Sequence, residues 1–145
     1  MGLRTLAVFL ILTPLLQALD PPPGQTAPAE PEPRYDTATS VDAMAVVTDV
    51  KEVAKNNPLC GSHLIVRLES ARSATDTLEV YLGPADFLKD FEFTLAKGDR
   101  IEIKGSRVRF GGNPIVLARE VRKNSTTLYL RDDRGAPYWK AAGKS

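Results

Sequence analysis

Apolar and polar residues alternate with a period of two over most of the chain beyond residue 40. This alternation predicts β-strands with one face in a core and the other in water. We expect six short strands, at Val41–Val53, His63–Glu69, Leu78–Leu82, Arg100–Arg109, Ile115–Lys123 and Thr127–Arg131. In the first strand, Met44, Val46 and Val50 occupy the positions that we assign to the core face.

One short helix interrupts the strands, because Pro84–Phe91 places a proline in a first turn ahead of apolar residues at helical spacing. A five-stranded barrel with its helix between the third and fourth strands is the OB-fold arrangement. We therefore predict a mainly β protein, a small five- to six-stranded OB-like barrel with one short helix between strands 3 and 4. An SH3-like barrel or an open β-sandwich is the alternative. Gly105, in mid-strand, is expected to mark a bulge or a tight bend where the barrel turns a corner.

The first forty residues lack the alternation. Arg4 stands ahead of an apolar run, Thr5–Leu16, that Pro14 interrupts. This run is shorter than the roughly twenty residues that span a bilayer, and it is typical of a signal peptide. We predict a signal peptide over residues 1–19, with a retained membrane anchor as the alternative. Cleavage would leave no stable membrane span, and the protein is expected to be exported, to the periplasm or beyond it.

Residues 20–40 are rich in proline, which favours extended or disordered chain. We predict a spacer over 20–40, a barrel domain over 41–139 and a flexible tail over 140–145. This division leaves roughly one hundred residues to fold, the size of one small domain with one core.

The chain contains one histidine, His63, and one cysteine, Cys60. A catalytic triad would need His63 beside a nucleophile, but Ser62 is its neighbour on a strand and points to the opposite face. Tetrahedral zinc needs three or four ligands, and these two residues supply only half of them. We therefore expect a protein that is not an enzyme, with no catalytic residue, metal site or cofactor, and Cys60 as a partly buried free thiol.

The net charge is +1, yet residues 97–145 carry twelve Lys/Arg against five Asp/Glu. OB-folds bind ligands along strands 2 and 3 and through the adjoining loops, and aromatic side chains there can stack on a base or sugar. The candidate ligand-binding residues are the basic and aromatic ones on these and later strands: Arg67, Tyr81, Arg107, Arg109, Phe110, Arg119, Arg122, Tyr129 and Arg131. Tyr138-Trp139 is a further candidate pair, although we interpret it as an aromatic cap on the open barrel.

Several short motifs carry a resemblance. Lys97–Gly105, of the form Gly-Asp-x-apolar-x-apolar-x-Gly, resembles the fourth strand of many OB-folds. Tyr81–Pro84, Leu128–Asp132 and Gly135–Trp139 resemble stretches of an uncharacterised family of small exported bacterial OB-fold proteins. The chain is also similar in layout to periplasmic bacterial OB-fold stress proteins. The resemblance implies a fold and supplies no catalytic residue, and a shared fold does not establish a shared ligand.

Export argues against nucleic acid as the main partner, because an exported domain rarely meets it. We interpret the chain as an exported, non-catalytic binding module of the cell envelope or periplasm. Its expected partner is an envelope protein, a glycan or a polyanion. The alternative is an OB-fold binder of single-stranded nucleic acid, or of another polyanion, through the basic face.

Overall fold

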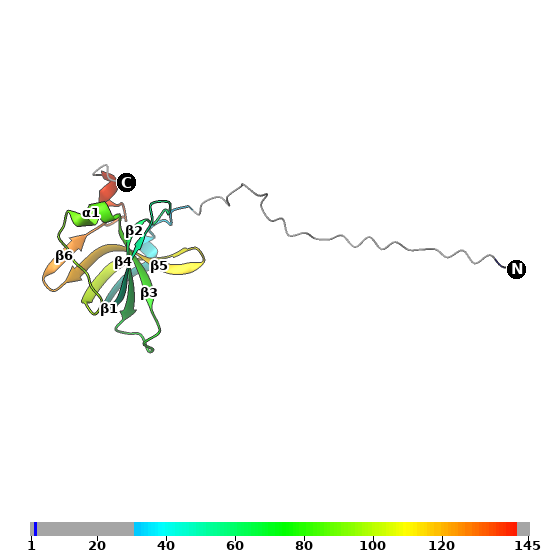
Figure 1. Ribbon diagram of the computed structural model, residues 1–145, viewed down its shortest axis with the longest axis horizontal. Helices are drawn as coiled ribbons and strands as arrows, with labels where there is room; N and C mark the ends of the chain where they lie inside the picture. Colours follow the sequence, from blue (N-terminus) through cyan, green and yellow to red (C-terminus); the bar gives the residue numbers. More distant parts are fainter. Residues whose placement is uncertain (1, 3–30, 142–145) are drawn as a thin grey trace.

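The computed structural model describes Gly2 and residues 31–141. The expected signal peptide, apart from Gly2, lies outside the described residues, as do spacer residues 20–30 and tail residues 142–145. The described part is mainly β, as the alternation predicted (Figure 1). Its elements are η1 (Thr37–Thr39), β1 (Ser40–Val53), β2 (Gly61–Leu68), β3 (Leu78–Gly83), α1 (Ala85–Lys89), β4 (Arg100–Phe110), β5 (Asn113–Lys123), β6 (Thr126–Tyr129) and α2 (Tyr138–Ala141).

Five strands form a closed barrel. β1 pairs antiparallel with both β2 and β4, β2 pairs with β3, and β4 pairs with β5. A parallel pairing of β3 with β5, in which Tyr81 lies opposite Leu117, closes the ring. β6 adds to β5 as an extra strand, and α1 follows β3. This topology confirms the prediction of an OB-like barrel with one helix between strands 3 and 4.

The barrel interior is filled by apolar side chains that alternate along each strand. They include Ala45, Val47, Leu64, Val66, Val80, Ile101, Ile103, Val121 and Leu128, all fully or almost fully buried. The alternation therefore assigned the core faces of β2, β3 and β4 correctly. β6 is shorter than expected and ends at Tyr129, but Leu130 and Arg131 still donate their backbone N–H groups to the carbonyl of Arg119.

The core face of the first strand was predicted wrongly in its first half. Ala45 and Val47 are buried, and Met44 and Val46 are on the other face. Both faces of this stretch carry apolar residues, so the period of two could not distinguish them. The register of β1 against β2 shifts between Val47 and Asp49, and this bulge brings Val50 back to the interior side, opposite Leu64.

Gly105 lies at a bulge between β4 and β5, as its mid-strand position predicted. The register passes from Lys104 opposite Glu120 to Gly105 opposite Ala118, which leaves Arg119 as the extra residue. A Cβ atom on Gly105 would lie 2.3 Å from the backbone oxygen of Leu117. The close approach of β5 to β4 therefore requires a residue without a side chain.

The end of the expected spacer packs against the barrel. The Ser106 hydroxyl donates to the carbonyl oxygen of Asp36 at 2.7 Å and accepts from its N–H at 3.0 Å. The ring of Tyr35 covers Gly135, where a Cβ would lie 2.1 Å from the ring. Residues 35–39 thus belong to the folded unit, which begins before residue 41.

We predict that Gly105→Ala lowers the free energy of unfolding by about 1–3 kcal/mol, because the added methyl group forces β5 away from β4. The midpoint of urea unfolding measures this loss. Gly112→Asn, in the open β4–β5 turn with a φ of 76°, is the matched control and should change the midpoint little, since asparagine tolerates this conformation. Equal midpoints for Gly105→Ala and the wild-type chain would contradict the steric explanation.

Candidate functional site

Around His63 and Tyr81, the wall formed by β2, β3 and β5 is buried on both of its faces. Directly paired residues share a face, and the register defines two rows, Leu64–Val80–Val116 on one face and His63–Tyr81–Leu117 on the other. The first row faces the barrel interior. The second row lies on the outside of the barrel, yet its side chains are also excluded from solvent. In an OB-fold this outer face is where ligands bind.

Trp139 of α2 covers this outer face. Its side chain is 4% exposed, and its ring lies edge-on to Tyr81 with 6.1 Å between the ring centroids. Gly83 makes room for the indole, since a Cβ there would lie 3.0 Å from the Trp139 ring. Phe87 of α1 packs on the same indole at 5.6 Å, so α1 and α2 lie at one end of the barrel (Figure 1). The expected cap is therefore buried against the outer wall, while Tyr138 is 43% exposed.

Hydrogen bonds fix the polar groups of the same wall. His63 Nε2 donates to the carbonyl oxygen of Leu59 at 2.6 Å, and its Nδ1 lies 2.8 Å from Glu79 Oε1. The Tyr81 hydroxyl donates to the carbonyl oxygen of Cys60 at 2.9 Å. Burial raises the pKa of this phenol. These contacts orient His63 and Tyr81 as parts of a packed layer and leave neither ring facing solvent.

Arg131 completes the cover over this wall. Its guanidinium carbon lies 4.9 Å from the centroid of the Trp139 ring, and its Nη1 donates to the carbonyl oxygen of Gly135 at 2.9 Å. The residue is 5% exposed, and burial lowers the pKa of its guanidinium. Its Nε and Nη2 atoms are buried with no hydrogen-bond partner among the described residues.

The structure does not gather the sequence-predicted binding residues into one groove. Tyr81 and Arg131 are buried beneath the C-terminal segment, and Phe110 is half-buried against the core. Arg119 and Arg122 are held by carboxylates, with Arg119 Nη1 at 3.0 Å from Asp133 and Arg122 Nη2 at 2.6 Å from Glu102. Five candidates keep exposed side chains, spread over four different strands: Arg67, Arg107, Arg109, Arg122 and Tyr129.

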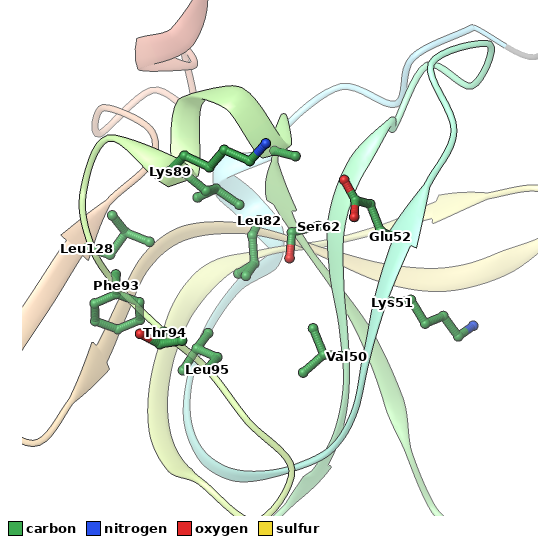
Figure 2. A pocket seen from close by; sticks show the side chains of 12 residues that line it. Val50, Lys51, Glu52, Ser62, Leu82, Lys89, Phe93, Thr94, Leu95 and Leu128 are labelled. Atoms are coloured by element: carbon green, nitrogen blue, oxygen red, sulfur yellow. The ribbon is translucent and has the colours of Figure 1, made fainter.

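A groove that the sequence did not indicate opens between β1 and α1 (Figure 2). Its volume is about 410 Å³, and most of its surface is apolar. The lining side chains include Val50, Leu82, Leu88, Phe93, Leu95 and Leu128, with Lys51, Glu52 and Lys89 among the charged residues. Val50 projects from β1 toward Leu95 across the groove and is 42% exposed. Part of the barrel interior is therefore accessible here.

One edge of β1 borders this groove and carries no strand. The pairing of β1 with β4 ends at Val46, and the N–H and carbonyl of Val47 then bond to Asp99 and Gly98. Beyond that point β1 pairs only with β2 within the described residues. The backbone N–H of Val50 donates instead to the Asp49 carboxylate at 2.9 Å. An unpaired strand edge is a template for another extended chain.

Metal-ligating side chains are not clustered in the described part of the chain, where no group of three or more His, Cys, Asp or Glu residues could hold an ion. Cys60 is a free, half-buried thiol.

Comparison with known proteins gives one family. The model of the MamS/MamX magnetosome protein family matches residues 44–128, which is more than half of the chain. This stretch runs from β1 to β6 and includes the whole groove lining but not Trp139 or Arg131. No curated protein and no solved structure matches the chain.

We predict that Trp139→Ala destabilises the protein by about 3–5 kcal/mol, the usual loss for a large buried aromatic side chain. The adjacent Tyr138→Ala, on the exposed side of α2, serves as the control and should cost under about 0.5 kcal/mol. Chemical denaturation of both variants measures the difference. Equal and small losses would show that Trp139 does not seal the outer wall.

Proposed function

The chain belongs to the MamS/MamX magnetosome protein family. We propose that it is an exported, non-catalytic interaction module. Its ligand, in this proposal, is an extended apolar segment of a partner protein, bound in the groove between β1 and α1. The groove beside an unpaired strand edge is the single observation that carries the proposal.

The strand edge and the apolar floor of the groove suit the backbone and the side chains of an extended peptide, respectively. The free edge of β1 offers backbone N–H and carbonyl groups to a peptide backbone, as in recognition by strand addition. Pairing at Val50 requires the Asp49 carboxylate to release the Val50 N–H. The apolar floor, with Leu82 and Leu128 at its base, offers room for alternate side chains of that peptide. Apolar burial would then supply affinity, and backbone pairing would fix the orientation of the segment.

Electrostatics favours a protein partner over a polyanion. Lys104 and Arg122 contact carboxylates on the outer face of β4 and β5, and Lys123 contacts Asp99 at 2.8 Å. Each such pair reduces the net charge that a phosphate backbone would meet. The aromatic ring best placed to stack on a base, Tyr81, lies under Trp139. These contacts leave the apolar groove as the better supported binding surface.

Export is part of the proposal and rests on the sequence of residues 1–19, where a short basic start precedes the Thr5–Leu16 apolar run. No helix among the described residues has the length and apolar character needed to cross a membrane.

We predict that a photo-reactive amino acid at Lys89, on the rim of the groove, forms one discrete covalent product with a partner in cells that naturally produce this chain. Val50→Asp in the same chain should reduce that product by about tenfold or more, because a carboxylate in an apolar contact costs well over the 1.4 kcal/mol that corresponds to tenfold. Tyr129→Asp, a similarly exposed position outside the groove, is the matched control and should leave the product unchanged.

Equal losses in the two aspartate variants, or products that persist in Val50→Asp, would rule out the groove as the binding surface. Hydrogen exchange of the purified complex gives a second readout. The amides of β1 from Thr48 to Val53 should exchange more slowly when the partner is bound, and unchanged exchange there would argue against strand addition.

We predict that the protein isolated from its native cells lacks residues 1–19. Mass spectrometry of the undigested protein measures this loss of mass. Replacement of Leu10 by Arg within the apolar run should block export and leave the uncleaved chain inside the cell. An intact N-terminus on the wild-type protein would contradict the cleavage that we propose. The groove does not depend on that result.

A further inference from the structure

Arg131 is a buried cation whose hydrogen-bonding capacity is only partly used. One of its nitrogens, Nη1, donates to Gly135, while Nε and Nη2 have no partner within residues 31–141. Burying a charged donor without a partner costs more than burying a neutral one. A bound group that accepts from these two nitrogens would remove that cost.

The two unused nitrogens form one edge of the guanidinium. Nε–H and one N–H of Nη2 point the same way in a planar fork, and this fork matches two oxygens of a carboxylate or phosphate. The guanidinium carbon lies over the Trp139 ring, 4.9 Å from its centroid, and this cation–π contact helps to hold the side chain in place. Arg131 is thus oriented by two contacts that both leave the bidentate edge unused.

A cavity lies directly beside Arg131. It has a volume of about 380 Å³ and lies between residues 32–35 and the turn at residues 134–137. The basic residues that line it are Arg34, Arg131, Arg134 and Lys140. Glu32 is the acidic residue in the lining, and its Oε2 lies 3.2 Å from Lys140 Nζ.

The charge of Glu32 acts on Arg131, whereas the carboxylate of Asp132, the next residue in the chain, is committed elsewhere. Its Oδ1 accepts from the backbone N–H groups of Arg134 and Ala136, each at 2.9 Å, and so shapes the turn. The cavity lining therefore carries four cations against one carboxylate, which favours an anion.

We propose that this cavity binds a phosphate group, with the Nε and Nη2 atoms of Arg131 as its bidentate anchor and Arg34, Arg134 and Lys140 around it. The phosphate is either free or the head group of an anionic lipid, and the two share the chemistry that Arg131 recognises. The anchoring atoms are buried in the unliganded chain, so binding requires the cover over them to open. The site is separate from the β1–α1 groove and does not rest on its function.

The single tryptophan of the chain provides the readout. Titration with inorganic phosphate at constant ionic strength, with chloride as the balancing anion, should change the Trp139 emission in a saturable way. Arg131→Gln should abolish the change. Arg107→Gln, which removes an exposed arginine outside the cavity lining, is the matched control and should retain it. Glu32→Gln should tighten binding by several-fold, because it removes the one negative charge of the lining.

A second measurement covers the case in which Arg131→Gln fails to fold. In the wild-type chain, the NMR signal of the Arg131 Nε–H should shift on addition of phosphate, while that of Arg107 should not. Vesicles of phosphatidylcholine with phosphatidic acid, compared with phosphatidylcholine alone, separate the two sources of the phosphate. Retention on the acidic vesicles together with a shift of the Arg131 Nε–H signal assigns a lipid head group. A shift with free phosphate alone assigns the soluble ion. The proposal is overturned if neither the Trp139 emission nor the Arg131 Nε–H signal of the wild-type chain changes with inorganic phosphate or with the acidic vesicles.

Discussion

The packing of the Trp139 ring over Gly83 and Tyr81 is the contact on which the accessible surface of this protein depends. It buries the part of the outer face of β2 and β3 around His63 and Tyr81, which an OB-like barrel would otherwise present to a ligand. The contact is feasible because position 83 lacks a side chain and because Arg131 and Phe87 pack on the same indole. Trp139 thus decides which surface of the barrel is accessible to a ligand.

Two of the pockets in the described part of the chain carry our proposals. The first is the apolar groove, which exists because β1 separates from β4 after Val46 and leaves one edge unpaired. The second is the basic cavity beside Arg131, formed where residues 32–35 cross the C-terminal turn. One suits an apolar segment and the other an anion. In our proposals the protein therefore makes two chemically distinct contacts, at separate places on the barrel.

The sequence predicted the barrel but little of the site. Strict alternation located β2, β3 and β4, and the bulge at Gly105 followed from a glycine in mid-strand. Alternation failed in the first half of β1, because successive residues such as Ala45 and Val46 are both apolar. The two faces of the strand there carry the same kind of side chain, so the pattern could not tell which one is buried. Burial of Tyr81 was not predictable, because it depends on Trp139, fifty-eight residues further along the chain. The groove likewise depends on where a strand pairing stops, which no local pattern records.

Acrylamide quenching of tryptophan fluorescence tests the sealing of the outer wall most directly, because the chain has one tryptophan. A sealed wall predicts weak quenching of Trp139 in the native protein, and quenching close to that of free N-acetyltryptophanamide after unfolding in urea. Strong quenching in the native state would mean that the indole is in solvent. The face formed by β2 and β3 would then be open to ligands, and Trp139 would not be its cover.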